Sequence, residues 1–144
     1  MKKLLRVDPA SHATHIALLI ARVATAVLMQ PHGLPKFGML AADPVEFADP
    51  FGLGATPSLL LSIFAEVVCS FFILIGLGTR LAVIPLIINM LVALIYVHGT
   101  DPFYKMELPL HFLMIYIVLL FTGSGKYSVD YLLQRREAKP GYRY

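Results

Sequence analysis

The sequence has few charged residues and a single cysteine. Charged residues make up 15% of the 144 residues, whereas hydrophobic residues make up 58%, and the mean hydropathy is +0.73. A soluble domain of this length buries too little volume to hide so much apolar surface. The composition therefore excludes an ordinary soluble domain and indicates an integral membrane protein, with one domain expected over residues 1–144.

The single cysteine, Cys69, lies inside an apolar run. One cysteine cannot form an intramolecular disulfide or a Cys-X-X-Cys redox pair, so thiol exchange within the chain is excluded. The sequence also lacks internal repeats and low-complexity segments. The net charge of +3 does not indicate nucleic acid binding, because the basic residues follow a pattern typical of membrane topology.

Four apolar runs are near the roughly 20 residues that a helix needs to cross about 30 Å of hydrocarbon. They predict transmembrane helices over about 14–30, 57–78, 81–98 and 108–125. Runs this long are not the strands of about 10 alternating residues found in membrane barrels. The predicted fold class is all-α, an integral membrane four-helix bundle.

Two shorter helices are expected outside the spans. Asp43-Pro44 is a start signal and Asp49-Pro50 a stop signal for a short interfacial helix in the first loop. Its aromatic residues would lie on the bilayer or fold over the mouth of the bundle. After the fourth span, Ser128 is a candidate N-cap for an amphipathic helix, "VDYLLQRR".

The basic residues predict the orientation. An even number of spans places both termini on one side, and the positive-inside rule makes that side cytoplasmic. Only Lys36 and Lys105 would then be outside, and "MKKLL" at the start is expected to be retained. The predicted inner basic residues are Lys2, Lys3, Arg6, Arg80, Lys126, Arg135, Arg136, Lys139 and Arg143.

Polar residues inside the spans are costly in hydrocarbon unless they are paired. Arg22, Glu66 and Asn89 each lie nine residues from the expected outer end of their helix, which predicts one layer roughly 13 Å deep. We expect these three residues to form a structural polar cluster. An incompletely paired Glu66 would be a candidate proton carrier, and no other catalytic residue is indicated. At the inner side, Arg80 could pair with Asp130.

A second polar group belongs to the outer end of the bundle. His32, Lys36, His98, Glu107 and His111 all lie near outer helix ends, and with Glu66 they could form a ligand-binding pocket. Their types permit a metal or haem site, but they lack a tight signature such as HExxH, so a haem or metal is disfavoured. The alternative is helix-end capping by the histidines and a lysine that reaches to the headgroups.

Several motifs together resemble the DoxX family of small bacterial four-helix membrane proteins. They are Arg22, "HGLPK" from His32 to Lys36, Glu66, "GLGTR" from Gly76 to Arg80, "NM" at Asn89 and Met90, and "GSGKYSVDYLL" from Gly123. The resemblance implies an inner-membrane bundle and, for some members, association with quinone-linked oxidation of sulfur compounds in a thiosulfate:quinone oxidoreductase or terminal oxidase complex. By position it implies importance, but no catalytic role, for Arg22, His32, Gly33, Lys36, Glu66, Arg80 and Asp130.

Three functions remain open at this stage. The first is a redox-associated subunit that binds a quinone or a similar amphipathic ligand at the outer end and depends on a partner for electrons. The second is a non-catalytic partner or assembly protein for another membrane complex. The third is small-solute transport by an oligomer, which has less support because no inverted repeat is visible.

Overall fold

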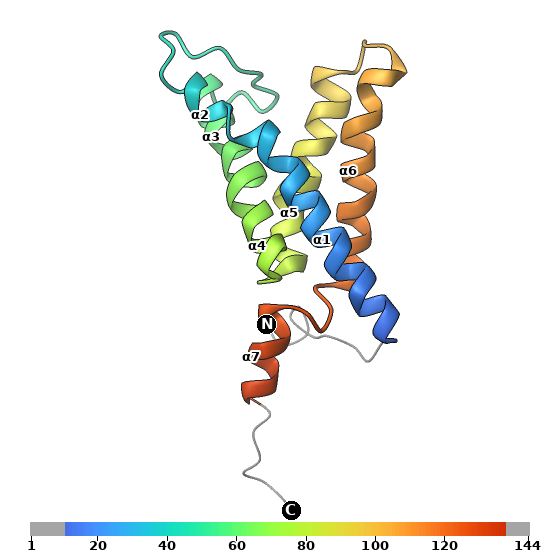
Figure 1. The fold of residues 1–144 in the computed structure, drawn as a ribbon. Coiled ribbons are helices and arrows are strands. Elements are labelled where there is room, and N and C mark those ends of the chain that lie inside the picture. The colour runs from blue at the N-terminus through green and yellow to red at the C-terminus, as the bar shows by residue number, and fades with distance from the viewer. Residues whose placement is uncertain (1–10, 138–144) are drawn as a thin grey trace, which may run out of the picture.

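The computed structural model describes residues 11–137, and every regular element in that range is helical (Figure 1). The elements are α1 (His12–Gly33), α2 (Lys36–Met39), α3 (Ala55–Ile63), the π-helix η1 (Phe64–Cys69), α4 (Ser70–Ile75), α5 (Thr79–Val92), the π-helix η2 (Ala93–Val97), α6 (Phe103–Thr122) and α7 (Val129–Glu137).

Four helical segments are long and apolar enough to cross a membrane, namely His12–Met39, Ala55–Ile75, Thr79–Val97 and Phe103–Thr122. This confirms the all-α fold with four candidate spans. The fourth segment begins before the expected start and runs through Pro109, because neighbouring helices can compensate for a missing backbone hydrogen bond. Large apolar side chains such as Ile20, Ile95 and Phe121 are 61%, 73% and 76% exposed, which is the surface that a bilayer would cover.

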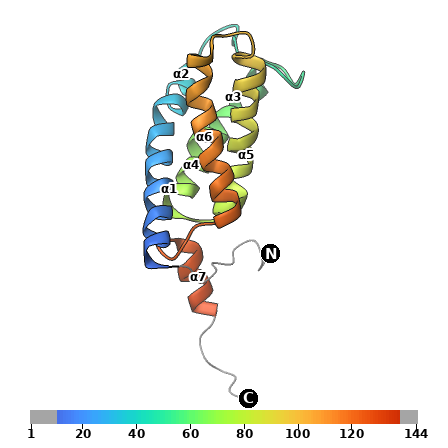
Figure 2. The ribbon, with the colours of Figure 1, turned by 90° about the vertical axis from the view of Figure 1, so that its right-hand side faces the viewer.

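The four spans form one bundle, and α7 lies beyond one end of it in both views (Figures 1 and 2). We call this end the α7 end and the opposite end, where α1 finishes and α6 begins, the cavity end. The core between the helices is filled by apolar side chains and by Tyr116, which is fully buried.

The loop between α2 and α3 differs from the prediction. A short helix is present, but it is α2 at Lys36–Met39, and residues 40–54 form turns, bends and irregular segments instead of a helix from Asp43. The Asp49 carboxylate accepts hydrogen bonds from the Leu53 and Gly54 amides at 2.9 and 2.7 Å and from the Ser58 hydroxyl at 2.8 Å. The Gly54 amide is the main reason that the pKa of Asp49 is lowered. Asp49 thus stabilises the start of α3.

Arg22 connects α1 to the loop before α7. Its Nη1 donates to the Ser124 carbonyl and its Nη2 to the Tyr127 carbonyl, both at 2.6 Å, and the side chain is buried. Gly76, with a φ of +71°, ends α4 directly against this guanidinium, where a side chain would clash. The predicted cluster of Arg22 with Glu66 and Asn89 is therefore wrong for Arg22.

The error arose from the assumption that the outer helix ends are level. Gly33, the last residue of α1, packs against Glu66, which lies three turns inside the second span. Arg22 is a further 11 residues back along α1, which corresponds to about 16 Å. Arg22 and Glu66 thus belong to opposite halves of the bundle.

The loops at the α7 end are held together by Asp130 and Arg80. The Asp130 carboxylate accepts a hydrogen bond from the Gly78 amide at 2.8 Å, while Arg80 Nη2 donates to the Phe121 carbonyl at 3.0 Å. A direct contact between Arg80 and Asp130 stays a prediction. Ser128 is confirmed as the N-cap of α7, because its hydroxyl accepts from the Tyr131 amide at 3.2 Å.

Replacement of Gly33 by alanine is expected to lower the free energy of unfolding by about 1–3 kcal/mol, the usual range for overpacking. The added Cβ would lie 2.8 Å from Val67 Cγ2 and 2.9 Å from Glu66 Cβ, so α1 would have to move away from η1. Gly38→Ala is the matched control, since a Cβ there meets nothing within 4 Å. Unfolding by SDS titration should separate the two variants; equal stabilities would show that the helices do not approach this closely.

Candidate functional site

A cavity of about 830 Å³ lies at the cavity end of the bundle. Its walls come from all four spans and from the loop residues 46–51, and most of the side chains are apolar. Four of the predicted ligand-binding residues line it, namely His32, Lys36, Glu66 and His98. The volume is typical of sites for small organic ligands.

The base of the cavity carries an ion pair between a partly buried lysine and a buried glutamate. Lys36 Nζ lies 2.6 Å from Glu66 Oε1, and the two side chains are 19% and 5% exposed. Asn89 Nδ2 donates to the same carboxylate oxygen at 2.7 Å, and Lys36 also donates to the Ser62 hydroxyl at 2.7 Å. We call these four residues the Lys36–Glu66 cluster. The predicted association of Glu66 with Asn89 is confirmed, and Lys36 takes the place expected of Arg22.

The second oxygen of Glu66, Oε2, is buried and has no hydrogen-bond partner among the described residues. A buried carboxylate oxygen is costly without a partner, so such atoms in native proteins usually mark an ordered water, a ligand or a proton site. Glu66 lies within η1, and π-turns inserted in α-helices frequently occur at functional positions.

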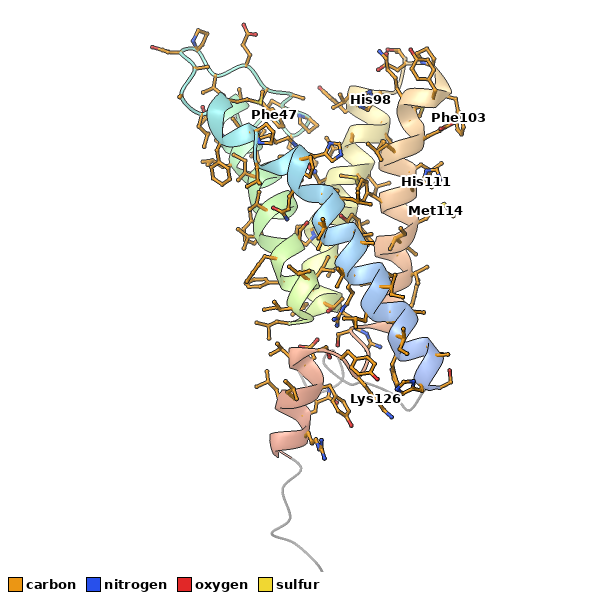
Figure 3. All side chains as sticks on the ribbon, viewed as in Figure 1. Phe47, His98, Phe103, His111, Met114 and Lys126 are labelled. Carbon is orange, nitrogen blue, oxygen red and sulfur yellow. The ribbon has the colours of Figure 1, made fainter. Side chains whose placement is uncertain are left out.

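The rim of the cavity is aromatic. The ring of His32 is exposed and lies edge-on to Phe112 at 6.1 Å between centroids, and Lys36 Nζ lies 5.5 Å from the ring centre of Phe47. Phe47 and Phe51 line the cavity, which corresponds to the alternative in which the first loop folds over the bundle mouth. Figure 3 places Phe47 and His98 at this same end of the molecule.

His98 belongs to a second charged group at the rim. Its Nδ1 lies 2.8 Å from Asp101 Oδ2, and Lys105 Nζ lies 3.2 Å from Asp101 Oδ1. The hydrogen bond from His98 is the main cause of the lowered pKa of Asp101, and Lys105 adds to it. The charge of Lys105 is therefore already compensated.

Glu107 and His111 do not line the cavity, so the prediction that they join the other residues in one pocket is wrong. Both are exposed, and His111 Nδ1 bonds to the Glu107 carbonyl at 2.6 Å within the helix itself. Figure 3 shows His111 pointing away from the bundle. The face of α6 that turns inward instead carries Pro109, Phe112 and Tyr116. Within residues 11–137 no three His, Cys, Asp or Glu side chains are grouped to hold a metal ion.

Sequence reasoning missed two serines of the cavity wall. Ser58, Ser62 and Glu66 follow one another at intervals of four in an otherwise apolar run, which places them on one face of a helix. That polar stripe was the available signal. On this face the Ser62 hydroxyl accepts a hydrogen bond from Lys36, and the Ser58 hydroxyl donates one to Asp49.

These features define a four-helix membrane protein with a mostly apolar cavity above a buried lysine–glutamate pair. The chain belongs to the DoxX family, because the DoxX family model matches residues 17–99, which is more than half of the chain and includes the Lys36–Glu66 cluster. The match confirms the resemblance seen in the motifs.

One curated relative is an uncharacterized membrane protein of Mycobacterium tuberculosis. It is 33% identical to this chain over 92 residues, which are 54% of this chain and 56% of that protein. The chain thus spans just over half the length of the relative that it matches. No solved structure matches the chain.

Proposed function

We propose that the protein binds a quinone, or a small amphipathic ligand of similar shape, in the cavity and serves as a membrane subunit of a redox system. The observation that carries this proposal is the Lys36–Glu66 cluster at the base of an apolar cavity of about 830 Å³. An apolar wall suits a ring and tail, and a few polar groups at one end fix the orientation of the ligand.

The cluster can supply hydrogen bonds to a carbonyl group. An ammonium group has three N–H donors, and the described contacts of Lys36 use two of them, to Ser62 and Glu66. The Asn89 amide likewise has a second N–H. Quinone carbonyl oxygens are acceptors, so these donors and the His32 ring at the rim suit them.

Glu66 is the candidate proton carrier of this proposal. Reduction of a quinone to a quinol takes two electrons and two protons. The Glu66 carboxylate would first take up a proton from water and then pass it to an oxygen of the reduced ring. Electrons would come from a partner redox enzyme, because the single cysteine excludes a thiol pair in this chain. The protein would then be an accessory subunit, and the partner or a second copy would bind on the bundle surface.

The affinity for a quinone is expected to depend on residues that line the cavity and not on residues outside it. The protein in nanodiscs, titrated with decylubiquinone, should show saturable quenching of its tyrosine fluorescence. Lys36→Met should weaken binding about 10- to 150-fold, since a hydrogen bond from a charged donor contributes about 1.5–3 kcal/mol. His32→Ala should weaken it less.

His111→Ala and Lys126→Met are matched controls, because neither side chain lines the cavity. The proposal fails if no quinone binds saturably in the bilayer. It also fails if His111→Ala reduces affinity as much as His32→Ala, since binding would then involve another face of the bundle.

We also propose that both termini are cytoplasmic and that the cavity opens on the outer side of the bacterial inner membrane. The described loops support this orientation: Arg80, Lys126 and Arg135 lie toward the α7 end, and Asp43, Glu46, Asp49, Asp101 and Glu107 gather at the cavity end with only Lys36 and Lys105. The predicted inner basic residues 2, 3, 6, 139 and 143 lie outside the described range.

Labelling of introduced cysteines should decide the orientation. In a Cys69→Ala background, an impermeant thiol reagent added to intact cells should modify cysteine at position 105 and not at position 135. Lys105 is preferable to Lys36 as the reporter, because its side chain is 47% exposed whereas that of Lys36 is 19% exposed. The reverse labelling pattern would invert the topology.

A further inference from the structure

We infer that Glu66 determines the charge of the ligand: by neutralising Lys36, it restricts the cavity to amphiphiles with an uncharged head and excludes carboxylates and other anions. This inference rests on the proposed ligand-binding function of the cavity, and it specifies the class of ligand. It is not what the residue types alone suggest, because lysines and histidines that line one cavity can attract anions.

The charges around the cavity balance. Its described lining has two lysines, Lys36 and Lys105, and two glutamates, Glu46 and Glu66. Each lysine is also within 3.2 Å of a carboxylate oxygen, Lys36 of Glu66 and Lys105 of Asp101. A ligand anion would therefore find no uncompensated lysine charge in the described wall.

The geometry keeps Lys36 and Glu66 together. Asn89 donates to the oxygen that Lys36 binds, and Ser62 accepts from the Lys36 ammonium, so the pair is held from α3 and α5 as well as from its own elements. An anion that approached Lys36 would meet the Glu66 carboxylate in apolar surroundings, where repulsion between like charges is strong. An uncharged carbonyl or hydroxyl meets no such repulsion and can still bond to the remaining N–H groups of Lys36 and Asn89.

Two probes of equal tail length test the inference. Tritiated dodecanol and dodecanoate would be titrated onto the full-length protein in nanodiscs of zwitterionic lipid, with binding to empty nanodiscs subtracted. The unaltered protein should bind dodecanol saturably and dodecanoate at least tenfold more weakly. Glu66→Gln, which keeps the shape of the side chain but leaves the charge of Lys36 uncompensated, should bind dodecanoate at least tenfold more tightly than the unaltered protein does.

Two further variants make the test specific. Lys36→Met combined with Glu66→Gln should lose the gained affinity for dodecanoate, because no uncompensated charge remains. Glu107→Gln removes a carboxylate that does not line the cavity and should leave both affinities unchanged.

Equal affinity of the unaltered protein for both probes would overturn the inference, and this arm requires no substitution. A folded Glu66→Gln variant with no gain for dodecanoate would overturn it as well. The outcome is distinguishable from the quinone proposal: if decylubiquinone does not bind but the dodecanoate gain appears, the quinone proposal fails and the charge selectivity of the cavity stands.

Discussion

Arg22→Met is expected to destabilise the protein by about 3–6 kcal/mol, because two hydrogen bonds from a charged donor are lost at about 1.5–3 kcal/mol each. The Ser124 and Tyr127 carbonyls would lose their guanidinium partner inside the bundle. Asp130, within electrostatic range of Arg22, would lose a compensating charge. The 123–128 loop and α7 should then detach from the bundle, which proteolysis near Lys126 and SDS titration would both detect.

Arg135→Met is the control for this prediction, since Arg135 lies on α7 with an exposed side chain. It should leave the free energy of unfolding within the range of ordinary surface substitutions, about ±0.5 kcal/mol. Comparable stability of the Arg22 and Arg135 variants would contradict the role of Arg22 as the link between α1 and the α7 end.

Removal of either partner of the Lys36–Glu66 pair is expected to lower the free energy of unfolding by about 3–5 kcal/mol if the remaining charge stays buried, and by less if water reaches it. Lys36→Met leaves Glu66, 5% exposed, without its cation, and Glu66→Gln leaves Lys36 without its anion. The double variant Lys36→Met with Glu66→Gln should recover part of the loss, because neither charge remains.

Free energies of unfolding should also show that Arg22 and the Lys36–Glu66 cluster are independent sites. Losses from Arg22→Met and Glu66→Gln should add when the two are combined, since their described hydrogen bonds go to different partners. Arg22 also lies about 16 Å along α1 from Gly33, the residue that packs against Glu66. The double variant Arg22→Met with Glu66→Gln could instead recover part of the lost free energy of unfolding, while the double variant of Lys36 and Glu66 does not. That result would mean that α1 is not offset against η1 as the contact of Gly33 with Glu66 requires.

The sequence predicted the spans because hydrophobic length is a local property that a bilayer enforces. Four apolar runs of adequate length become four helices, and Ser128 before an amphipathic segment caps the helix that follows. His32, Lys36, Glu66 and His98 also line one cavity. His32, Lys36 and His98 lie near helix ends that meet at the cavity end, whereas Glu66 reaches the cavity from three turns inside the second span.

The relative height of the helices could not be predicted in this way. Counting residues from each helix end assumes that the ends are level, whereas Gly33 allows α1 to finish against Glu66, well inside the second span. This offset exchanges Arg22 for Lys36 as the partner of Glu66. The offset between α1 and the second span is set by the contact between the two helices, and the pattern of residues in one sequence does not show which residues of two helices are in contact.

The rotation of α6 about its own axis could not be predicted either, and the predicted start of the helix was wrong as well. Pro109 suggested a helix beginning there, but the helix begins at Phe103, and the inward positions are then Pro109, Phe112 and Tyr116. His111 falls between them and turns outward. The π-turns of η1 and η2 shift the register of the other spans in a similar way, and neither has a signature in the sequence.

The central claim, that the cavity binds an uncharged amphiphile above the Lys36–Glu66 cluster, is tested most directly by a high-resolution density map of the nanodisc-embedded protein with decylubiquinone. Density for the quinone ring is expected inside the cavity, with a carbonyl oxygen within hydrogen-bond distance of Lys36 Nζ or Asn89 Nδ2. Quinone density confined to the lipid-facing surface, with the Lys36–Glu66 cluster unchanged and out of contact with it, would contradict the account.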